Sequence, residues 1–364
     1  MHFEMKELPR QDPGRVRDRR IERVVELVPP AQILDDLPLT SAREDAVIRH
    51  REEVAAILDR DDDRLLVVVG PCSVHDTDAA LEYAQRLSAR ATELEDDLCV
   101  AMRVYFEKPR TTTGWKGLIN DPHLDGTRDV NRGLHMARRL LLEVLDLGLP
   151  IGCEFLDPIT PQYISDVVAW GAIGARTTES QTHRQLASGL SMPVGFKNGT
   201  SGSVKLAVDA VRAAAAPHAF AGVDVSGTPA IFYTEGNPDC HVILRGGRGA
   251  PNYAPETVAE TLEQLREAGL KERLLIDASH DNSGKDHERQ AQVAAEIAEQ
   301  IASPNPGIVG VMLESFLVAG NQDLESGEPL VYGQSITDAC MDWETTVLAL
   351  DRLAAAVRGR REAA

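Results

Sequence analysis

The sequence has no apolar run approaching the roughly eighteen residues that a membrane-spanning helix needs. Its N-terminal stretch is charged throughout and has no apolar segment ahead of a small-residue cleavage site, so no secretory signal is visible. Basic residues are outnumbered, since 38 Lys and Arg face 57 Asp and Glu and give a formal net charge of −19. That balance argues against a general binder of nucleic acid or of anionic membranes. These absences predict a cytoplasmic protein with no membrane or nucleic-acid partner.

Cysteine is also scarce, with five residues in a chain of 364 and no CxxC pair. An odd and sparse set excludes a disulfide framework in a chain this long. We expect reduced and mostly buried thiols, with Cys72 as the exception. What the sequence does contain is apolar residues (43%) and charged residues (26%) in proportions that permit a large buried core.

Short apolar runs recur along the chain, each followed by polar residues and then, in most cases, by an amphipathic helical pattern. The runs cover residues 65–72, 99–106, 150–155, 172–177, 193–198, 240–247, 273–280 and 308–315. Continuous rather than alternating apolar runs are typical of strands that are buried on both faces of a parallel sheet. Eight such strands with intervening helices predict an α/β fold, a (β/α)8 TIM barrel.

A doubly wound open sheet is the alternative fold. It would normally carry a glycine-rich dinucleotide turn after its first strand. The first run here ends in Gly70-Pro71-Cys72-Ser73, and a proline does not fit that turn. The barrel is therefore favoured.

Two pieces are expected outside the barrel strands and helices. Residues 1–64 form an N-terminal extension ahead of a barrel over 65–364, and residues 219–233 read as an inserted β-hairpin turning at Ser226-Gly227. The extension is either a solvated arm or a segment that packs on another subunit and takes part in regulation. The second interpretation would cover its apolar stripe, which consists of Ile21, Val24, Val25 and Leu27.

Basic side chains cluster at the predicted carboxyl ends of the strands, where the active sites of such barrels lie. They are Arg103, Lys108, Arg176, Lys197 and Arg245, joined by Arg110 just beyond. One of them alone would most simply be a surface ion pair. Arginine suits carboxylate and phosphate because its planar fork donates two parallel hydrogen bonds. Their convergence predicts a site for a small polyanionic molecule.

A second group at the same ends consists of Cys72, His280, Glu314 and Asp338. A thiolate, an imidazole and two carboxylates form a mixed soft and hard donor set, suited to Mn, Fe, Co or Zn. No local spacing motif links the four residues, so their proximity rests only on the barrel register. Taken singly, His280 would be a partly buried histidine and Cys72 a packed thiol.

With these residues in view, the sequence closely resembles the class I, microbial-type 3-deoxy-D-arabino-heptulosonate 7-phosphate (DAHP) synthases. The resemblance covers roughly residues 18–360 and rests on long blocks rather than on short motifs. They include LLVVVGPCSVHD, MRVYFEKPRTTTGWKGLINDPHLDG, GLPIGCEFLDPITPQYISDVVAWGAIGARTTESQTHRQLASGLSMPVGFKNGT, HVILRGG, IDASHDNSGK and ESFLVAGNQDLESGEPL.

The resemblance implies condensation of phosphoenolpyruvate with erythrose 4-phosphate, the first step of the shikimate pathway, with release of phosphate. It implies a divalent metal, manganese above all, on Cys72, His280, Glu314 and Asp338. Phosphoenolpyruvate would contact Arg103, Lys108, the backbone of Ala175, Arg176, Lys197 and Arg245. Erythrose 4-phosphate would contact Lys108, Arg110 and Thr111. The candidates for proton transfer are Lys108, Glu154 and His280.

The resemblance also implies a homodimer or homotetramer with feedback inhibition by an aromatic amino acid. The residues that match the effector pocket of the family are Asp157, Pro161, Gln162, Ser191, Phe220 and Gly222. A serine is common at the position of Gly222 in phenylalanine-sensitive members. Its loss leaves room near the effector ring and favours tyrosine. The alternative is that Gly222 is merely a hairpin glycine that tolerates a positive φ.

Two further alternatives come from other functions. A sibling synthase that uses arabinose 5-phosphate is disfavoured by the KPRT segment at 108–111, the long extension and the hairpin. A non-catalytic barrel that binds aromatic amino acids and regulates a partner, such as a chorismate-using enzyme, would have lost metal ligands or basic residues. None of them is lost here. Association of an active enzyme with such a partner stays open.

Overall fold

The computed structural model describes residues 7–8, 16–110, 114–303 and 307–363. Eight strands within these ranges close into a barrel, in the order β1-β10-β9-β8-β5-β4-β3-β2, and every neighbouring pair is parallel. The strands are β1 (Leu65–Gly70), β2 (Leu98–Arg103), β3 (Ile151–Glu154), β4 (Trp170–Ile173), β5 (Val194–Lys197), β8 (His241–Leu244), β9 (Leu274–Asp277) and β10 (Ile308–Glu314). Each of the eight apolar runs overlaps one of them, and the predicted (β/α)8 barrel is confirmed. The run at 172–177 is displaced, since β4 begins two residues before it and ends at Ile173.

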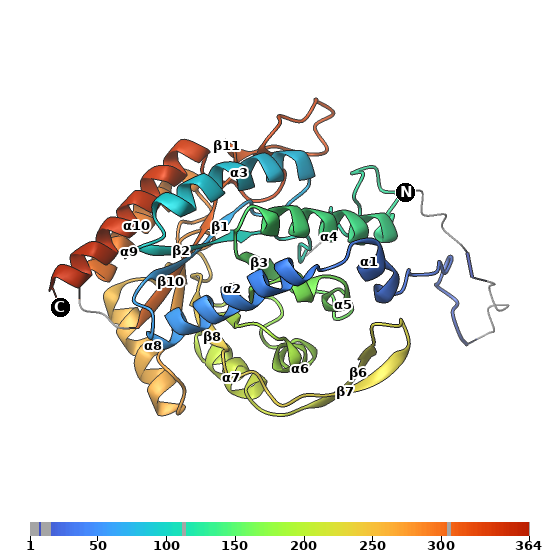
Figure 1. The fold of residues 1–364 in the computed structure, drawn as a ribbon, viewed down its shortest axis with the longest axis horizontal. Helices are drawn as coiled ribbons and strands as arrows, with labels where there is room; N and C mark the ends of the chain where they lie inside the picture. Colours follow the sequence, from blue (N-terminus) through green and yellow to red (C-terminus); the bar gives the residue numbers. More distant parts are fainter. Residues whose placement is uncertain (1–6, 9–15, 111–113, 304–306, 364) are drawn as a thin grey trace.

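Helices surround the strands (Figure 1). They are α1 (Pro30–Asp36), α2 (Ser41–Asp59), α3 (Thr77–Glu93), α4 (Val130–Asp146), α5 (Pro161–Ile164), α6 (Gln181–Gly189), α7 (Lys205–Ala214), α8 (Pro255–Glu267), α9 (His287–Ala302) and α10 (Trp343–Ala363). A small two-stranded sheet pairs β11 (Val318–Asn321) with β12 (Gln334–Ser335) beyond the last barrel strand. Among the helices of the described residues, none is both long enough and apolar enough to cross a membrane.

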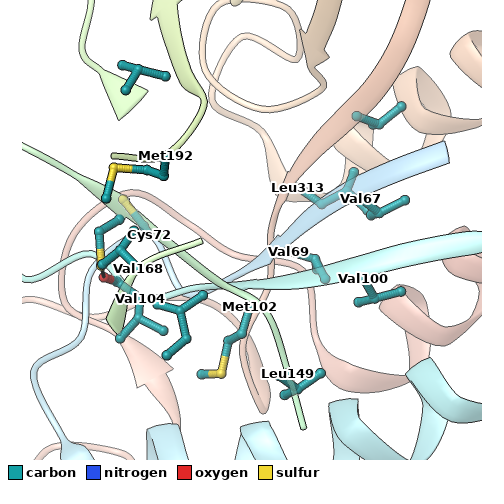
Figure 2. Close-up of a cluster of buried hydrophobic side chains, with 14 of the residues drawn as sticks. Val67, Val69, Cys72, Val100, Met102, Val104, Leu149, Val168, Met192 and Leu313 are labelled. Atoms are coloured by element: carbon teal, nitrogen blue, oxygen red, sulfur yellow. Dashed lines mark hydrogen bonds between the residues drawn. The ribbon is translucent and has the colours of Figure 1, made fainter. Parts of the chain in front are cut away.

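The barrel strands are apolar throughout because their two faces pack into different cores. In β1, Leu65, Val67 and Val69 belong to the larger buried cluster, which includes the apolar faces of the helices. Leu66 and Val68 belong to a second cluster. Successive side chains of a strand point to opposite faces, and in a barrel one of these faces is the packed interior. Figure 2 shows part of the larger cluster and includes Cys72, which follows β1.

The predicted hairpin is confirmed, with β6 (Ala219–Val223) antiparallel to β7 (Pro229–Tyr233). It extends away from the barrel strands on the side where α1 lies (Figure 1). The N–H of Ala31 in α1 donates to the carbonyl of Val225 at 2.8 Å, so the hairpin turn contacts the N-terminal extension. Gly227 in the turn has a φ of +82°, a conformation that glycine adopts without strain.

Helix α5 begins at Pro161, which fixes φ at a helical value and lacks the N–H that a first helical position leaves unpaired. A threonine before a proline at the first helical position predicts that the Thr160 side chain caps the helix, but it makes no capping hydrogen bond. Its hydroxyl instead donates to Glu107 Oε1 at 3.3 Å. This hydrogen bond connects the start of α5 to the segment that follows β2.

Helix α10 offers a matched pair of leucines for testing the core. Leu353 is fully buried, whereas Leu348 on the same helix is 65% exposed. We expect Leu353→Ala to lower the free energy of unfolding by about 2–5 kcal/mol, because it leaves a cavity in the core. Leu348→Ala should change it by no more than about 0.5 kcal/mol. Denaturant unfolding of both variants checks this, and equal losses would contradict the packing described here.

Candidate active site

Parallel register brings the ends of β1 and β10 together at one end of the barrel. Gly70 pairs with Glu314, and the N–H of Ser315 donates to the Gly70 carbonyl at 2.9 Å. The loop that carries Asp338 returns to the same place, because the N–H of Met341 donates to the Glu314 carbonyl at 3.0 Å. Donor atoms of Cys72, Glu314 and Asp338 consequently lie within 4.8 Å of one another.

His280 follows β9, the neighbour of β10 in the barrel. Its Nε2 lies 3.7 Å from Glu314 Oε1, and its Nδ1 lies 2.8 Å from Asp277 Oδ2. Burial lowers the pKa of His280 and so favours the neutral ring that a metal ligand needs. The structure thus brings all four predicted ligands to one place. One thiol, one imidazole and two carboxylates fit a divalent transition metal, and the family that the sequence resembles is one of metal-dependent enzymes.

Basic side chains surround this group and compensate its charge. Arg103 is buried at the end of β2, and its Nη2 donates to Glu314 Oε1 at 2.9 Å. The Lys108 Nζ lies 2.6 Å from Cys72 Sγ and 3.3 Å from Asp338 Oδ2. Such close pairs are required because an isolated charge is costly to bury.

These pairs shift the pKa values of both partners. Burial opposes the charged form of Lys108, but its interactions with Cys72, Asp338 and Glu314 outweigh it and raise its pKa. Burial and the Glu314 carboxylate raise the pKa of the Cys72 thiol, while Lys108 lowers it. Burial likewise opposes the charged form of Asp338, yet Lys108 and His280 hold its pKa below the usual value. The lysine therefore stays an ammonium at neutral pH, next to the candidate metal ligands.

A pocket opens at this end of the barrel, and its described lining contains most of the predicted substrate contacts. The predicted residues that line it are Cys72, Arg103, Lys108, Glu154, Ala175, Arg176, Lys197, Arg245, His280 and Asp338. Arg245 is mostly buried and pairs with Asp281. Arg110 is exposed and lies outside this lining, with its Nε donating to the Trp115 carbonyl at 2.9 Å. Thr111 lies outside the described residues.

Glu154 reaches the pocket because of a glycine opposite it. A Cβ built on Gly174 would lie 2.3 Å from Glu154 Oε1, so any other residue there would displace the carboxylate. Glu154 is the last residue of β3 and is only partly buried. Gly174 thus keeps a carboxylate in a pocket that is otherwise rich in cations.

Sequence reasoning missed two charged residues of this site. Asp277 is the last residue of β9 and lies 3.0 Å from Lys197 Nζ as well as next to His280. Lys285 lines the pocket, and its Nζ lies 3.4 Å from Asp338 Oδ1. The position of Asp277 at a strand end could have identified it. Lys285 lies beyond the strand, in a turn where its N–H donates to the His280 carbonyl at 2.6 Å, and no strand register points to it.

Glu107 links the KPRT segment, which begins at Lys108, to the residues that follow β3. It precedes Lys108, is almost fully buried, and its Oε1 accepts from the N–H of Asp157 at 3.2 Å. Burial and the nearby Asp157 raise the pKa of Glu107 to about 8.

Most of the predicted effector residues line a second cavity, of about 630 Å³. Pro161, Gln162, Ser191, Phe220 and Gly222 line it, between α5, the α6 end and the hairpin. Asp157 lies outside that lining, and its Oδ1 accepts from the Ile159 N–H at 2.8 Å.

Gly222 lies inside β6 and is not among the glycines with positive φ, so the hairpin-glycine alternative does not describe it. A Cβ at this position would lie 2.8 Å from the Phe232 ring. Phe232 also lines the cavity and stacks on Phe220 with ring centroids 5.8 Å apart. The room that the missing serine side chain is expected to leave is therefore taken up by Phe232, and a serine at this position would displace that ring.

The raised pKa of Glu107 predicts a pH-dependent stability difference for Glu107→Gln. Between about pH 4.5 and 8 the folded protein holds a proton on Glu107 that the unfolded chain releases, so this residue destabilises the fold as pH rises. The free energy of unfolding of the variant, relative to wild type, should rise with pH by up to about 1.4 kcal/mol per unit. Denaturation at pH 5, 6.5 and 8 measures this. Glu263→Gln, an exposed control on α8, should give a flat difference, and a flat difference for Glu107→Gln would refute the assignment.

Comparison with known proteins agrees with this geometry. The DAHP synthetase I family matches residues 43–351. The Phe-sensitive phospho-2-dehydro-3-deoxyheptonate aldolase of Escherichia coli K12 is 57% identical over 344 residues, 94% of this chain and 98% of its own length. The Tyr-sensitive protein of the same organism is 54% identical over 88% of this chain and 90% of its own.

A solved structure of the phospho-2-dehydro-3-deoxyheptonate aldolase of Francisella tularensis SCHU S4 superimposes with a TM-score of 0.92. It is 51% identical and covers 94% of this chain and 99% of its own. The barrel, the site at its strand ends and these matches over nearly the whole length lead to one assignment. The chain belongs to the DAHP synthetase I family.

Proposed function

We propose that this protein is a DAHP synthase, which condenses phosphoenolpyruvate with erythrose 4-phosphate and water to give DAHP and phosphate. The observation that carries the proposal is one pocket in which basic side chains surround a compact group of metal-binding side chains. Two phosphorylated substrates need the first feature, and activation of an aldehyde is served by the second. Every basic residue and every metal-binding residue that the family resemblance implies is present in this sequence.

Phosphoenolpyruvate would lie against the basic residues at the ends of β2, β4, β5 and β8. Arg103, Lys197 and Arg245 are buried and already paired with carboxylates, so their positions are fixed before substrate arrives. Lys108, Arg176 and the backbone of Ala175 would complete the contacts. Pre-positioned donors of this kind lower the entropy cost of bringing two substrates together.

The divalent metal would be held by Cys72, His280, Glu314 and Asp338, with manganese proposed ahead of iron, cobalt and zinc. Bound there, it would act as a Lewis acid on the aldehyde oxygen of erythrose 4-phosphate. Lys108 lies next to Cys72 and Asp338 and would bind both substrates. Arg110 and Thr111 would hold the phosphate of erythrose 4-phosphate.

The reaction joins the enol carbon of phosphoenolpyruvate to the aldehyde carbon of erythrose 4-phosphate. Water then adds to the second carbon of the former phosphoenolpyruvate, and phosphate leaves with cleavage of the C–O bond. Proton transfer would fall to Lys108, Glu154 and His280, which all line the pocket. Lys108 stays an ammonium and His280 would be a metal ligand, so the Glu154 carboxylate is the best placed of the three to accept a proton from water.

Feedback inhibition by an aromatic amino acid would act through the second cavity, and we favour tyrosine. The hairpin that forms its wall carries exposed apolar side chains, with Ile231 at 65% and Tyr233 at 81%. Ile21 and Val24 of the extension are also about half exposed in the single chain. Such surfaces favour a homodimer or homotetramer over a solvated arm. Association with another chorismate-pathway enzyme is a further possible use of the same surfaces.

The test of the proposed reaction is release of phosphate from phosphoenolpyruvate. We expect turnover with erythrose 4-phosphate, loss of turnover after chelation, and recovery when Mn²⁺ is restored. Arabinose 5-phosphate in place of erythrose 4-phosphate should give at most slow turnover. Absence of turnover with each of Mn²⁺, Fe²⁺, Co²⁺ and Zn²⁺ would refute the proposal and favour a regulatory barrel.

The effector proposal predicts a change of preference in Gly222→Ser. The added side chain crowds Phe232 in the cavity, so the ratio of tyrosine to phenylalanine needed for half-inhibition should rise. Ala230→Ser is the control, because Ala230 pairs with Gly222 across the hairpin without lining the cavity. Inhibition curves with both amino acids measure the ratio. An unchanged ratio in Gly222→Ser would contradict the proposed basis of tyrosine selection.

A further inference from the structure

Asp277 is the most completely enclosed carboxylate of the site. It is the last residue of β9, pairs with Met312 in the register of β10, and is 0% exposed. It is absent from the described lining of the pocket, so it does not meet a substrate there. A carboxylate that is buried without contact to a ligand must be compensated by its protein neighbours.

The two oxygens of Asp277 have neighbours with different roles, and Oδ1 accepts hydrogen bonds whereas Oδ2 has only ion-pair neighbours among the described residues. Oδ1 accepts from the Ser279 hydroxyl at 2.5 Å and from the Ser279 N–H at 3.0 Å, which fixes the plane of the carboxylate. Oδ2 lies 2.8 Å from His280 Nδ1 and 3.0 Å from Lys197 Nζ. One oxygen atom is therefore shared by a proposed metal ligand and a proposed phosphoenolpyruvate contact.

The contact with His280 determines which ring nitrogen is available. The Ser279 hydroxyl donates to Asp277 Oδ1 at 2.5 Å, so its oxygen is left to accept from His280 Nδ1, which lies 2.7 Å away. The proton of the neutral ring therefore lies on Nδ1, on the side of the Asp277 carboxylate. Nε2 then presents its lone pair on the side of the ring where Glu314 Oε1 lies, 3.7 Å away. Metal-binding histidines are commonly oriented in this way by a carboxylate behind the ring.

The backbone around His280 makes such support necessary. His280 has a φ of +52°, a left-handed conformation that is rare for a residue with a side chain. Its carbonyl accepts from the Lys285 N–H at 2.6 Å, and the Asn282 side chain donates to the Asp277 carbonyl at 2.8 Å. The turn is thus held at both ends, while the ring itself is held by Asp277 and Ser279, whose hydroxyl lies 2.7 Å from Nδ1.

We infer that Asp277 is a positioning residue, which orients the His280 ring for metal binding through the Ser279 hydroxyl on Oδ1 and holds the Lys197 ammonium beside the ring through Oδ2. The inference rests on the proposed function, because it assigns the support of that metal site. It makes metal affinity depend on a residue that is not itself a ligand. It also means that one carboxylate supports both the neutral metal-binding ring and a substrate-binding cation.

The test is direct measurement of metal affinity without substrates, by competition between the intact protein and a chelator for Mn²⁺ and Co²⁺. Asp277→Asn keeps the shape of the side chain and removes its charge, and it should weaken metal binding by about 10–100-fold. The absorption bands of the Co²⁺-loaded protein should also change, because the His280 ring is no longer fixed. Unchanged affinity and an unchanged Co²⁺ spectrum in a folded Asp277→Asn variant would overturn the inference.

A control variant separates positioning from general loss of charge. Asp239→Asn breaks an ion pair with buried Arg273, which keeps Asp59 as a partner, and should leave both metal affinity and the Co²⁺ spectrum unchanged. Equal weakening in Asp277→Asn and Asp239→Asn would show a merely structural effect and overturn the inference.

If Asp277→Asn does not fold, Ser279→Ala provides the test. It keeps the charge and removes the hydroxyl that fixes Oδ1, so a smaller loss of metal affinity in the same direction is expected, and no loss would contradict the inference. Failure of the proposed function can be told apart from failure of this inference. It would appear as wild-type protein that binds metal without turning over the two substrates. The inference about Asp277 would then stand or fall on metal affinity alone.

Discussion

Mutual compensation of buried charges at one end of the barrel is the interaction on which the site depends. Arg103 with Glu314, Lys108 with Asp338, and Lys197 with Asp277 place cations within 3.3 Å of carboxylates in a largely buried setting. Removal of one partner leaves the other charge buried without compensation, which costs far more than the pair itself contributes. The same pairs fix the side chains in the positions that substrates and metal would use.

The barrel fold itself brings these side chains together. Parallel strands end at the same level, so a residue at the end of β1 meets residues at the ends of β2, β9 and β10 without long loops. The interior of the barrel is filled by apolar side chains from alternate positions, which gives the strand ends a rigid base. Insertions such as the hairpin then add a second cavity without disturbing the strands.

Much of this could be predicted from the sequence, for identifiable reasons. Continuous apolar runs located all eight strands, and strand-end positions located Cys72, His280, Glu314 and the cations Arg103 and Lys197. Asp277 was overlooked because a single acidic residue at the end of an apolar run has no pattern of its own. Lys285, the displacement of Arg110 from the pocket lining and the use of Thr160 by Glu107 depend on turn geometry, which no local spacing encodes.

The measurement that tests the central claim most directly is crystallographic, with Mn²⁺ and phosphoenolpyruvate bound to the intact protein. Anomalous scattering locates the manganese independently of any assumption about its ligands. The account predicts one strong manganese peak bonded to Cys72, His280, Glu314 and Asp338, with phosphoenolpyruvate held by Arg103, Lys197 and Arg245 in the same pocket. Manganese bound elsewhere, or phosphoenolpyruvate held away from these cations, would contradict it.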